Sequence, residues 1–182
     1  MKLLFPKPYA DFVARLRVPS GFALVAAFAW FAHPDLRSLA YGLPLSLMGL
    51  AVRGWAAGHL AKNQALAASG PYAYTRNPLY LGTLLVAAGL AVASRSAGLG
   101  ALFAAVFLCI YLPVIQLEQQ HLRSLFPEYA AYAARVPSLL PRMTPAGQPR
   151  AFQRALYMQN REYQAAAGFL AGALFLLWKA LR

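Results

Sequence analysis

Five apolar runs with almost no charge constrain the fold of this chain more than any other feature. They cover residues 18–31, 39–60, 79–93, 97–115 and 163–178. Hydrophobic residues make up 60% of the chain and charged residues 12%, a composition too apolar for an ordinary soluble domain. Long runs of this kind predict membrane-spanning helices. We therefore predict an all-α integral membrane protein, one domain over residues 1–182, with about five transmembrane helices.

The segments outside the runs predict interfacial helices. Residues 1–17 carry four basic residues among aromatic and aliphatic ones, a pattern typical of a basic amphipathic segment lying on a membrane surface. They contain no small-residue cleavage site, so we expect this segment to be retained. Residues 116–135 repeat apolar side chains at spacings of three and four, with Pro127 suited to a first helical turn and Pro137 to a stop. Residues 141–149 form a linker, and an interfacial helix pattern over 150–163 leads into the last run.

The net charge of +12 is dispersed among hydrophobic segments. In such a chain basic residues meet anionic lipid headgroups, so we predict membrane lipids and no nucleic acid as partners. Five spans put the termini on opposite sides, and thirteen of the seventeen Lys and Arg residues then fall on one side. The positive-inside rule makes that side cytoplasmic. We predict a bacterial-type inner membrane, with the amino terminus and the active site facing the cytoplasm.

Metal binding and disulfide formation find no support in the spacing of candidate ligands. The histidines, His33, His59 and His121, lie on three different segments without metal-ligand spacing, so we expect no metal site. The single cysteine, Cys109, lies inside an apolar run and is expected only to pack.

A polar, proline-rich stretch between two apolar runs is the most specific feature of the chain. We call residues 69–82 the signature; they read Ser69-Gly70-Pro71-Tyr72-Ala73-Tyr74-Thr75-Arg76-Asn77-Pro78-Leu79-Tyr80-Leu81-Gly82. Gly70-Pro71 is a turn signal, and Pro78 disfavours helical geometry at Asn77. The sequence therefore predicts irregular backbone around Arg76 and Asn77, with free polar groups available to a ligand.

A second motif follows about forty residues later. It reads Glu118-Gln119-Gln120-His121-Leu122, then Phe126-Pro127-Glu128-Tyr129-Ala130-Ala131-Tyr132, Val136-Pro137 and Pro141. The signature resembles the pattern G-P-Y-x-x-x-R-[HN]-P-x-Y-x-G of integral membrane methyltransferases related to isoprenylcysteine carboxyl methyltransferases and phospholipid methyltransferases. The second motif resembles the tail of the same family in order, spacing and residue type. The resemblance covers residues 45–142, a family-like catalytic core, and leaves 150–182 as an interfacial helix plus an extra carboxy-terminal span.

The resemblance implies a cofactor, S-adenosyl-L-methionine, bound between the signature and the tail helix. It also implies a lipid-like or prenylated small-molecule acceptor that enters from the bilayer. Arg76 and Glu118 are implied as catalytic residues, and Glu118 suits the ammonium and ribose hydroxyls of the cofactor because a carboxylate accepts charge-assisted hydrogen bonds. By motif position, the implied cofactor-binding residues are Asn63, Leu66, Gly70, Tyr72, Asn77, Pro78, Leu79, Tyr80 and Glu118.

Four positions depart from the family pattern. Asn77 stands where many members have His, Gln119 replaces a second Glu, and Pro127 replaces Gly. Val114 stands where prenylcysteine-type members carry an Arg thought to hold the carboxylate of the acceptor. The acceptor therefore stays open between an isoprenylcysteine-type carboxylate and a phospholipid-type amine, and the oligomeric state also stays open.

Arg53 places a charge near the end of the second apolar run. A charge at membrane depth is a functional candidate, and we predict that Arg53 binds the substrate, through a lipid phosphate or a carboxylate. The alternative is an arginine that snorkels to the interface. Two small-xxx-small pairs, Gly54/Gly58 and Gly168/Gly172, predict close helix packing.

Two other functions remain possible from the sequence. A sterol-reductase-like membrane enzyme would share a related signature and use NADPH, although the residues from Glu118 to Pro141 fit the methyltransferases better. A non-catalytic membrane scaffold could retain the pocket without turnover.

Overall fold

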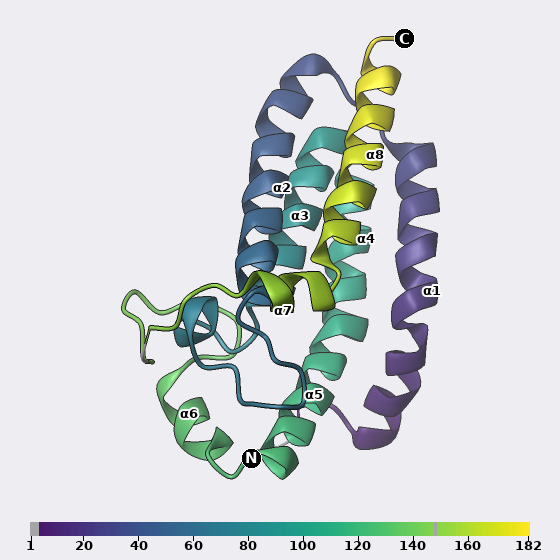
Figure 1. Ribbon diagram of the computed structural model, residues 1–182. Helices are drawn as coiled ribbons and strands as arrows, with labels where there is room; N and C mark the ends of the chain where they lie inside the picture. The colour runs from purple at the N-terminus through teal and green to yellow at the C-terminus, as the bar shows by residue number, and fades with distance from the viewer. Residues whose placement is uncertain (1–3, 148) are drawn as a thin grey trace. The chain divides into compact units, whose positions relative to one another are not determined.

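The computed structural model describes residues 4–147 and 149–182. Over these residues the chain is helical and contains no strand, which confirms the predicted all-α class. Lys2 of the predicted basic segment and Gln148 of the predicted linker lie outside the described residues. The elements (Figure 1) are α1 (Lys7–Phe31), α2 (Leu36–Ala57), η1 (Gly70–Ala73), α3 (Pro78–Ser94), α4 (Ala97–Val106), η2 (Phe107–Tyr111), α5 (Leu112–Leu125), α6 (Tyr129–Arg135), α7 (Arg154–Gln159) and α8 (Glu162–Ala180).

The chain divides into two compact units. Unit 1 comprises residues up to 46, residues 87–120 and residues 172–182, and unit 2 comprises residues 47–86 and 121–171. Helices α2, α3, α5 and α8 contribute residues to both units. The signature lies in unit 2, and Glu118 lies in unit 1.

Two helices in the described part of the chain are long and apolar enough to cross a membrane. They are α1 and the continuous helix Ala97–Leu125, and α3 is apolar but shorter. By length and composition, two helices of the described chain could therefore span a membrane, where the sequence predicted about five. The helices predicted over residues 39–60 and 163–178 are present as α2 and α8, with ends shifted by one to three residues.

The first predicted boundary is wrong. Residues 1–17 were expected to form a segment separate from the first span, yet α1 runs without interruption from Lys7 to Phe31 and includes Pro19. Proline in a helix removes one backbone hydrogen bond. The helix nevertheless continues on both sides of Pro19, so the basic residues from Lys7 onward share a helix with the apolar run.

The boundary predicted at residue 116 is also wrong, because α4, η2 and α5 form one helix over 97–125. The η2 segment is a turn of π-helix in which the amide of Leu112 donates to the carbonyl of Phe107. A π turn leaves carbonyls poorly paired within the helix, and the hydroxyl of Tyr9 donates to the carbonyl of Cys109 at 2.8 Å. Tyr9 thus satisfies one of these carbonyls from α1, which packs against α4 and η2.

Two further helices are shorter than predicted. The helix expected over 116–135 is interrupted at residues 126–128, and Pro127 lies in this interruption. The second part is a separate helix, α6, which ends at Arg135, in agreement with the stop predicted at Pro137. The interfacial pattern over 150–163 forms a helix only in α7, over Arg154–Gln159.

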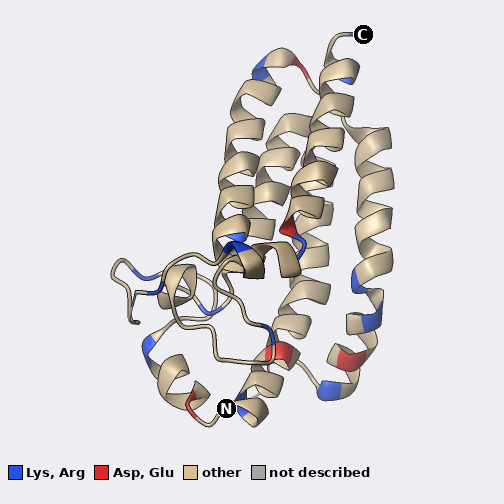
Figure 2. Ribbon diagram, viewed as in Figure 1, with Lys and Arg blue, Asp and Glu red and all other residues tan. Residues whose placement is uncertain are grey.

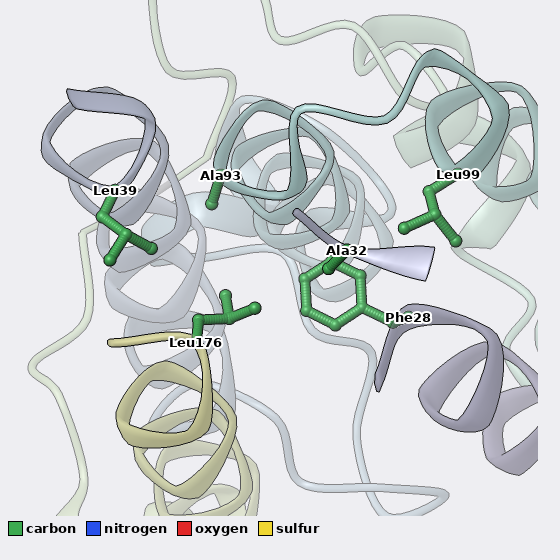
Figure 3. Close-up of a cluster of buried hydrophobic side chains, with 6 residues drawn as sticks. All are labelled: Phe28, Ala32, Leu39, Ala93, Leu99 and Leu176. Carbon is green, nitrogen blue, oxygen red and sulfur yellow. The ribbon is translucent and has the colours of Figure 1, made fainter. Parts of the chain in front are cut away.

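The core of unit 1 is a small cluster of buried side chains from five segments. Figure 3 shows the six residues of this cluster, Phe28, Ala32, Leu39, Ala93, Leu99 and Leu176. Polar groups close the turns around it. The Asp35 carboxylate accepts from the Ser38 amide at 2.7 Å while the Asp35 amide donates to the Ser38 hydroxyl at 3.0 Å, a reciprocal cap at the start of α2. Asp35 also pairs with Arg95 at 2.6 Å.

Helices α2 and α3 approach closely at glycines in both units. In unit 1 a Cβ placed on Gly89 would lie 2.4 Å from the carbonyl oxygen of Gly42 and 2.6 Å from the amide of Ser46. In unit 2 a Cβ on Gly82 would lie 2.6 Å from the carbonyl oxygen of Gly49. These contacts involve backbone atoms, which cannot move aside.

The predicted glycine pairs behave differently. A Cβ on Gly58 would meet the Phe152 ring, whereas a Cβ on Gly168 or Gly172 would meet no described atom within 4 Å. The prediction of close packing is therefore wrong for the Gly168/Gly172 pair within this chain.

We predict that Gly89→Val destabilises the fold by about 2–3 kcal/mol, because overpacking against rigid backbone cannot be relieved by side-chain movement. Thermal unfolding in detergent, followed by circular dichroism, measures the effect. Gly168→Val is the matched control, since its Cβ would occupy open space. Equal melting temperatures for both variants would contradict the close approach of α2 and α3.

Candidate functional site

The signature opens with a single turn of 3-10 helix. Gly70 has φ +56°, a left-handed conformation that favours glycine. Space is also restricted there, because a Cβ on Gly70 would lie 2.6 Å from the ring of His59. The turn predicted at Gly70-Pro71 is confirmed, and it continues as η1 over Gly70–Ala73.

An extended stretch after α6 lies along the signature and holds it through backbone hydrogen bonds. We call residues 136–146 the tail segment. The Arg76 amide donates to the carbonyl of Pro137 at 2.9 Å, and the Arg142 amide donates to the carbonyl of Tyr74 at 3.0 Å. A third bond joins the Ala146 amide to the carbonyl of Ala73 at 2.9 Å. The backbone around Arg76 is irregular as predicted, but its amide is bound within the protein and is not free for a ligand.

Side chains of the signature strengthen the same contact. Asn77 is buried, and its amide nitrogen donates to the carbonyl of Ser138 at 2.7 Å and to the Ser138 hydroxyl at 3.2 Å. The Thr75 hydroxyl lies 3.1 Å from the carbonyls of Ser138 and Leu139. It also accepts from the backbone N–H of Asn77 at 3.3 Å. Asn77 therefore positions the tail segment through its N–H groups. Its binding to the cofactor stays a prediction.

Two buried tyrosines of α6, Tyr129 and Tyr132, contact the signature and the residues around it. The Tyr132 hydroxyl donates to the carbonyl of Tyr72 at 2.8 Å. Tyr129 and Tyr132 form a cluster with Val136, against which Leu66 and other apolar residues pack. Burial raises the pKa of the Tyr132 hydroxyl, and it raises the pKa of Tyr129 as well, where nearby Arg76 opposes part of the effect. Both phenols are thus held in the neutral form.

Arg76 is only partly satisfied within this cluster. Its Nη1 donates to the Tyr129 hydroxyl at 3.3 Å, while its Nε is buried without a hydrogen-bond partner among the described residues. A buried donor left unpaired is costly, and native structures usually pair it with protein, water or a ligand. Arg76 is therefore the residue of the signature with unused capacity to bind an anion.

The loop before the signature surrounds a hollow of about 320 Å³ in unit 2. Leu66 lines it, together with His59, Ser69 and Arg150. His59 Nδ1 lies 3.2 Å from the Ser69 hydroxyl, and burial lowers the pKa of His59, so this ring is neutral near pH 7. The hollow therefore combines apolar and neutral polar groups with one cation.

The remaining predicted cofactor residues in unit 2 flank this region. Asn63 has φ +60° and is exposed, and Pro78 begins α3. The carbonyl of Leu79 accepts from the Thr83 hydroxyl at 2.9 Å, and Tyr80 is buried. Unit 2 thus brings together every predicted cofactor residue except Glu118.

Glu118 lies on α5 in unit 1, where it is half exposed. Its carboxylate pairs with Arg17 of α1 at 3.4 Å. Two residues earlier, Gln116 holds residues 4 and 5, since its side-chain oxygen accepts from the amides of Leu4 and Phe5 at 2.7 and 3.0 Å. An exposed ion pair of this kind contributes little to stability. That Glu118 and the signature bind one cofactor stays a prediction.

Arg53 has a structural role that the sequence did not indicate. Its Nε and Nη2 donate to the two carboxylate oxygens of Glu162 at 3.0 and 2.7 Å, and Nη1 donates to the Thr83 hydroxyl and to the carbonyl of Leu79. Both charged side chains are mostly buried, with 22% and 11% of their surface exposed. All three guanidinium nitrogens are therefore engaged within unit 2, and substrate binding by Arg53 stays a prediction.

Two residues of the site were not predicted from the sequence. Ser138 receives the Asn77 side chain, and Glu162 is the partner of Arg53. Glu162 could have been noticed, because it is one of only five acidic residues and opens an apolar helix. Ser138 carried no comparable signal, because its role depends on the path of the tail segment.

The described residues contain no group of three or more His, Cys, Asp or Glu side chains that could hold a metal ion. Cys109 is a free cysteine and is exposed.

Comparison with known proteins finds one matching family model and two similar curated proteins. Residues 43–129 match the family model described as phospholipid methyltransferase, a range that contains the signature and Glu118. Over 108 residues the chain is 38% identical to "Cobalt-zinc-cadmium resistance protein CzcN" of Cupriavidus metallidurans, an alignment covering 56% of this chain and 50% of that protein. Over 117 residues it is 33% identical to "Nickel-cobalt-cadmium resistance protein NccN" of Alcaligenes xylosoxydans xylosoxydans, covering 63% and 54%. The chain spans about half the length of the curated relatives it matches. No solved structure matches it significantly.

We predict that Glu162→Gln destabilises the fold by about 2 kcal/mol, because it removes the charge that compensates the mostly buried Arg53. The midpoint of thermal unfolding in detergent should fall by several degrees. Glu128→Gln is the control, since Glu128 is exposed. A midpoint unchanged by Glu162→Gln would show that Arg53 does not depend on this partner.

We also predict a stability loss at alkaline pH that depends on Tyr132. The pKa of Tyr132 is raised in the folded state, so on raising the pH the unfolded chain loses the phenolic proton before the folded chain does. The folded state therefore keeps its full stability below the unfolded pKa of about 10, and it loses stability as the pH rises from there toward the folded pKa. Melting temperatures from about pH 8 to about pH 11 should fall less steeply for Tyr132→Phe than for the wild type. Tyr163→Phe removes an exposed hydroxyl and should leave the slope unchanged. Parallel pH curves for wild type and Tyr132→Phe would contradict this assignment.

Proposed function

From the match of residues 43–129 to the phospholipid methyltransferase family model, we propose that the chain transfers a methyl group from S-adenosyl-L-methionine to a lipophilic acceptor. The family match is the observation that carries the proposal, because it contains the signature and Glu118, the first residue of the second motif. We place the protein in a bacterial-type inner membrane with about five spans, and with its amino terminus and active site on the cytoplasmic face. The two long apolar helices support a membrane location.

The chemistry of the candidate residues fits the groups that S-adenosylmethionine presents. The cofactor has a carboxylate, an ammonium and ribose hydroxyls. Arg76 has a buried, unpaired Nε that suits the carboxylate, and Glu118 has a half-exposed carboxylate that suits the ammonium and the hydroxyls. The buried rings of Tyr72 and Tyr80 offer apolar surface for adenine.

The protein's own task in this reaction is to position the reactants and exclude water. When bound, S-adenosylmethionine supplies a methyl group already activated by its sulfonium, so the acceptor displaces it in line once correctly placed. The rigid contact between the signature and the tail segment suits this role, because a fixed backbone positions Arg76 reproducibly. A buried, neutral surround such as Tyr129 and Tyr132 strengthens electrostatic contacts to a charged ligand.

The acceptor determines whether a proton has to leave. A carboxylate is ionised at neutral pH and needs no base, whereas a lipid amine with a pKa near that of lysine must first lose a proton. Val114 is buried and apolar at the position where prenylcysteine-type members have an arginine. We therefore propose a lipid-like or prenylated acceptor and leave both O-methylation and N-methylation as outcomes of the experiment below.

The names of the two curated relatives favour a second, broader assignment. Both are named for resistance to cobalt and cadmium, and one each for zinc and nickel. We propose that methylation of a membrane component by this chain could serve metal resistance. Growth of a host expressing the chain in cadmium, compared with a host expressing Glu118→Gln, tests that role.

Binding experiments separate the methyltransferase from its alternatives. We predict that the purified protein in detergent binds S-adenosylmethionine and not NADPH in isothermal titration. Glu118→Gln should weaken binding roughly tenfold or more, because it removes a charge-assisted hydrogen bond. Glu128→Gln, an exposed acid outside the proposed pocket, should bind normally. Binding of NADPH would instead identify a reductase, and the absence of any methyl transfer despite cofactor binding would indicate a scaffold.

Product chemistry then identifies the acceptor. Membranes incubated with the protein and methyl-labelled cofactor are extracted, and the labelled lipid is treated with base. Methyl esters release the label and methylamines retain it.

A further inference from the structure

A long segment of unit 2 carries only positive charge. Residues 129–161 contain five arginines and no Asp or Glu, and we call them the basic segment. Acidic residues stand directly outside it, at Glu128 and Glu162. Figure 2 shows the ribbon between α6 and the start of α8 marked in blue without red. Such a segment attracts an anionic partner.

The arginines of this segment have no acidic partner within the described chain. Arg135, Arg150, Arg154 and Arg161 are exposed, and the salt bridges of the described residues involve other arginines. Arg142 donates to the carbonyl of Arg135 at 2.8 Å, which brings these two guanidinium-bearing residues together at the end of α6. Their charges are left for a partner outside the chain.

Large apolar side chains lie among these arginines in the sequence, and two of them are largely exposed. Met143 is 96% exposed and Leu140 is 78% exposed. Phe152 and Met158, further along the basic segment, are about half exposed. Leaving such side chains in water forgoes roughly 1.5–3 kcal/mol each relative to burial. Leu140 and Met143, three residues apart in the tail segment, are the most exposed of the four, and exposed large apolar groups next to each other mark a contact surface.

The exposure of Leu140 and Met143 does not come from a loose loop. Both belong to the tail segment, whose backbone is hydrogen-bonded to the signature at Arg76, Tyr74 and Ala73. The Asn77 side chain adds a further contact at Ser138. The fold therefore presents these two apolar side chains outward at fixed positions beside Arg142.

We propose that the basic segment docks on an anionic bilayer leaflet, with Leu140 and Met143 inserted at the boundary between headgroups and acyl chains and the exposed arginines on lipid phosphates. Arginine alternating with bulky apolar side chains is the chemistry of an interfacial membrane contact. A nucleic acid would use the arginines but leave Leu140 and Met143 in water, and an acidic protein surface would do the same.

The docking also has a consequence for the site, which rests on the proposed function. The tail segment that carries Leu140 and Met143 also holds Arg76 and Asn77. Contact with lipid therefore fixes the signature at the level of the leaflet, where a lipophilic acceptor reaches it without leaving the membrane. Anionic lipid should raise methyl transfer to an embedded acceptor while leaving cofactor affinity unchanged.

Site-directed fluorescence quenching tests the docking without requiring activity. Cys109 is the single cysteine, so Cys109→Ser removes the background thiol, and Met143→Cys or Leu140→Cys then takes a polarity-sensitive probe. The full-length protein is reconstituted into phosphatidylcholine vesicles with or without phosphatidylglycerol, each containing brominated lipid as quencher. We expect strong quenching and a blue shift at both positions in vesicles with phosphatidylglycerol. Replacing Arg135 and Arg154 together by Gln should reduce quenching by about half or more, because each arginine contributes roughly a fivefold preference for an anionic surface.

A probe at Glu128→Cys is the matched control, because this exposed acid lies just outside the basic segment. Quenching at residues 140 and 143 but not at 128 supports docking. A probe at 143 that stays unquenched in anionic vesicles overturns the proposal, and so does equal quenching at all three positions, which would reflect the probe itself. A chain that docks but transfers no methyl group would refute the proposed function alone.

Discussion

The contact between the tail segment and the signature is the constraint on which the rest of unit 2 depends. Between η1 and α3 the signature does not form a regular helix, so part of its backbone needs partners from outside the signature. Buried peptide groups must be paired, and the tail segment supplies partners for Ala73, Tyr74 and Arg76. Asn77 and Thr75 add side-chain bonds to Ser138. The tail segment thus holds the irregular part of the signature through backbone and side-chain hydrogen bonds.

This contact explains why the two family motifs belong together. The second motif supplies Tyr129 and Tyr132, which pack under the signature, and it leads directly into the tail segment that covers it. A substitution in the tail can thus alter the signature without touching a ligand. Elsewhere in unit 2, buried polar groups also connect separate elements. Arg53 of α2 bonds to the carbonyl of Leu79 in α3 and to Glu162 at the start of α8.

The all-α class and the position of most helices were predictable, because apolar runs and turn residues mark them directly. Helix α6 ends two residues before Pro137, and α3 and α4 are separate helices divided at residues 95–96, as the two apolar runs predicted. The sequence changes from apolar to amphipathic near residue 116, yet one helix runs through 97–125. Hydropathy reports what surrounds a helix and does not mark where the helix ends, so the continuous helix could not be predicted from it. The signature was recognisable as irregular, yet its hydrogen-bond partners were not. They depend on residues sixty positions away, and the prediction of free polar groups at the Arg76 amide failed for that reason.

The π turn between α4 and α5 changes the direction in which the side chains of α5 face. An α-helix turns by about 100° per residue, so one extra residue accommodated in Phe107–Tyr111 rotates the whole of α5 relative to a regular continuation of α4. Deleting one residue there would restore uniform winding and carry Gln116 and Glu118 to a different side of the helix. Gln116 would then leave the amides of Leu4 and Phe5, and Glu118 would leave Arg17. The direction in which Glu118 faces is thus set about two to three turns upstream, by a local change in helical pitch outside the second motif.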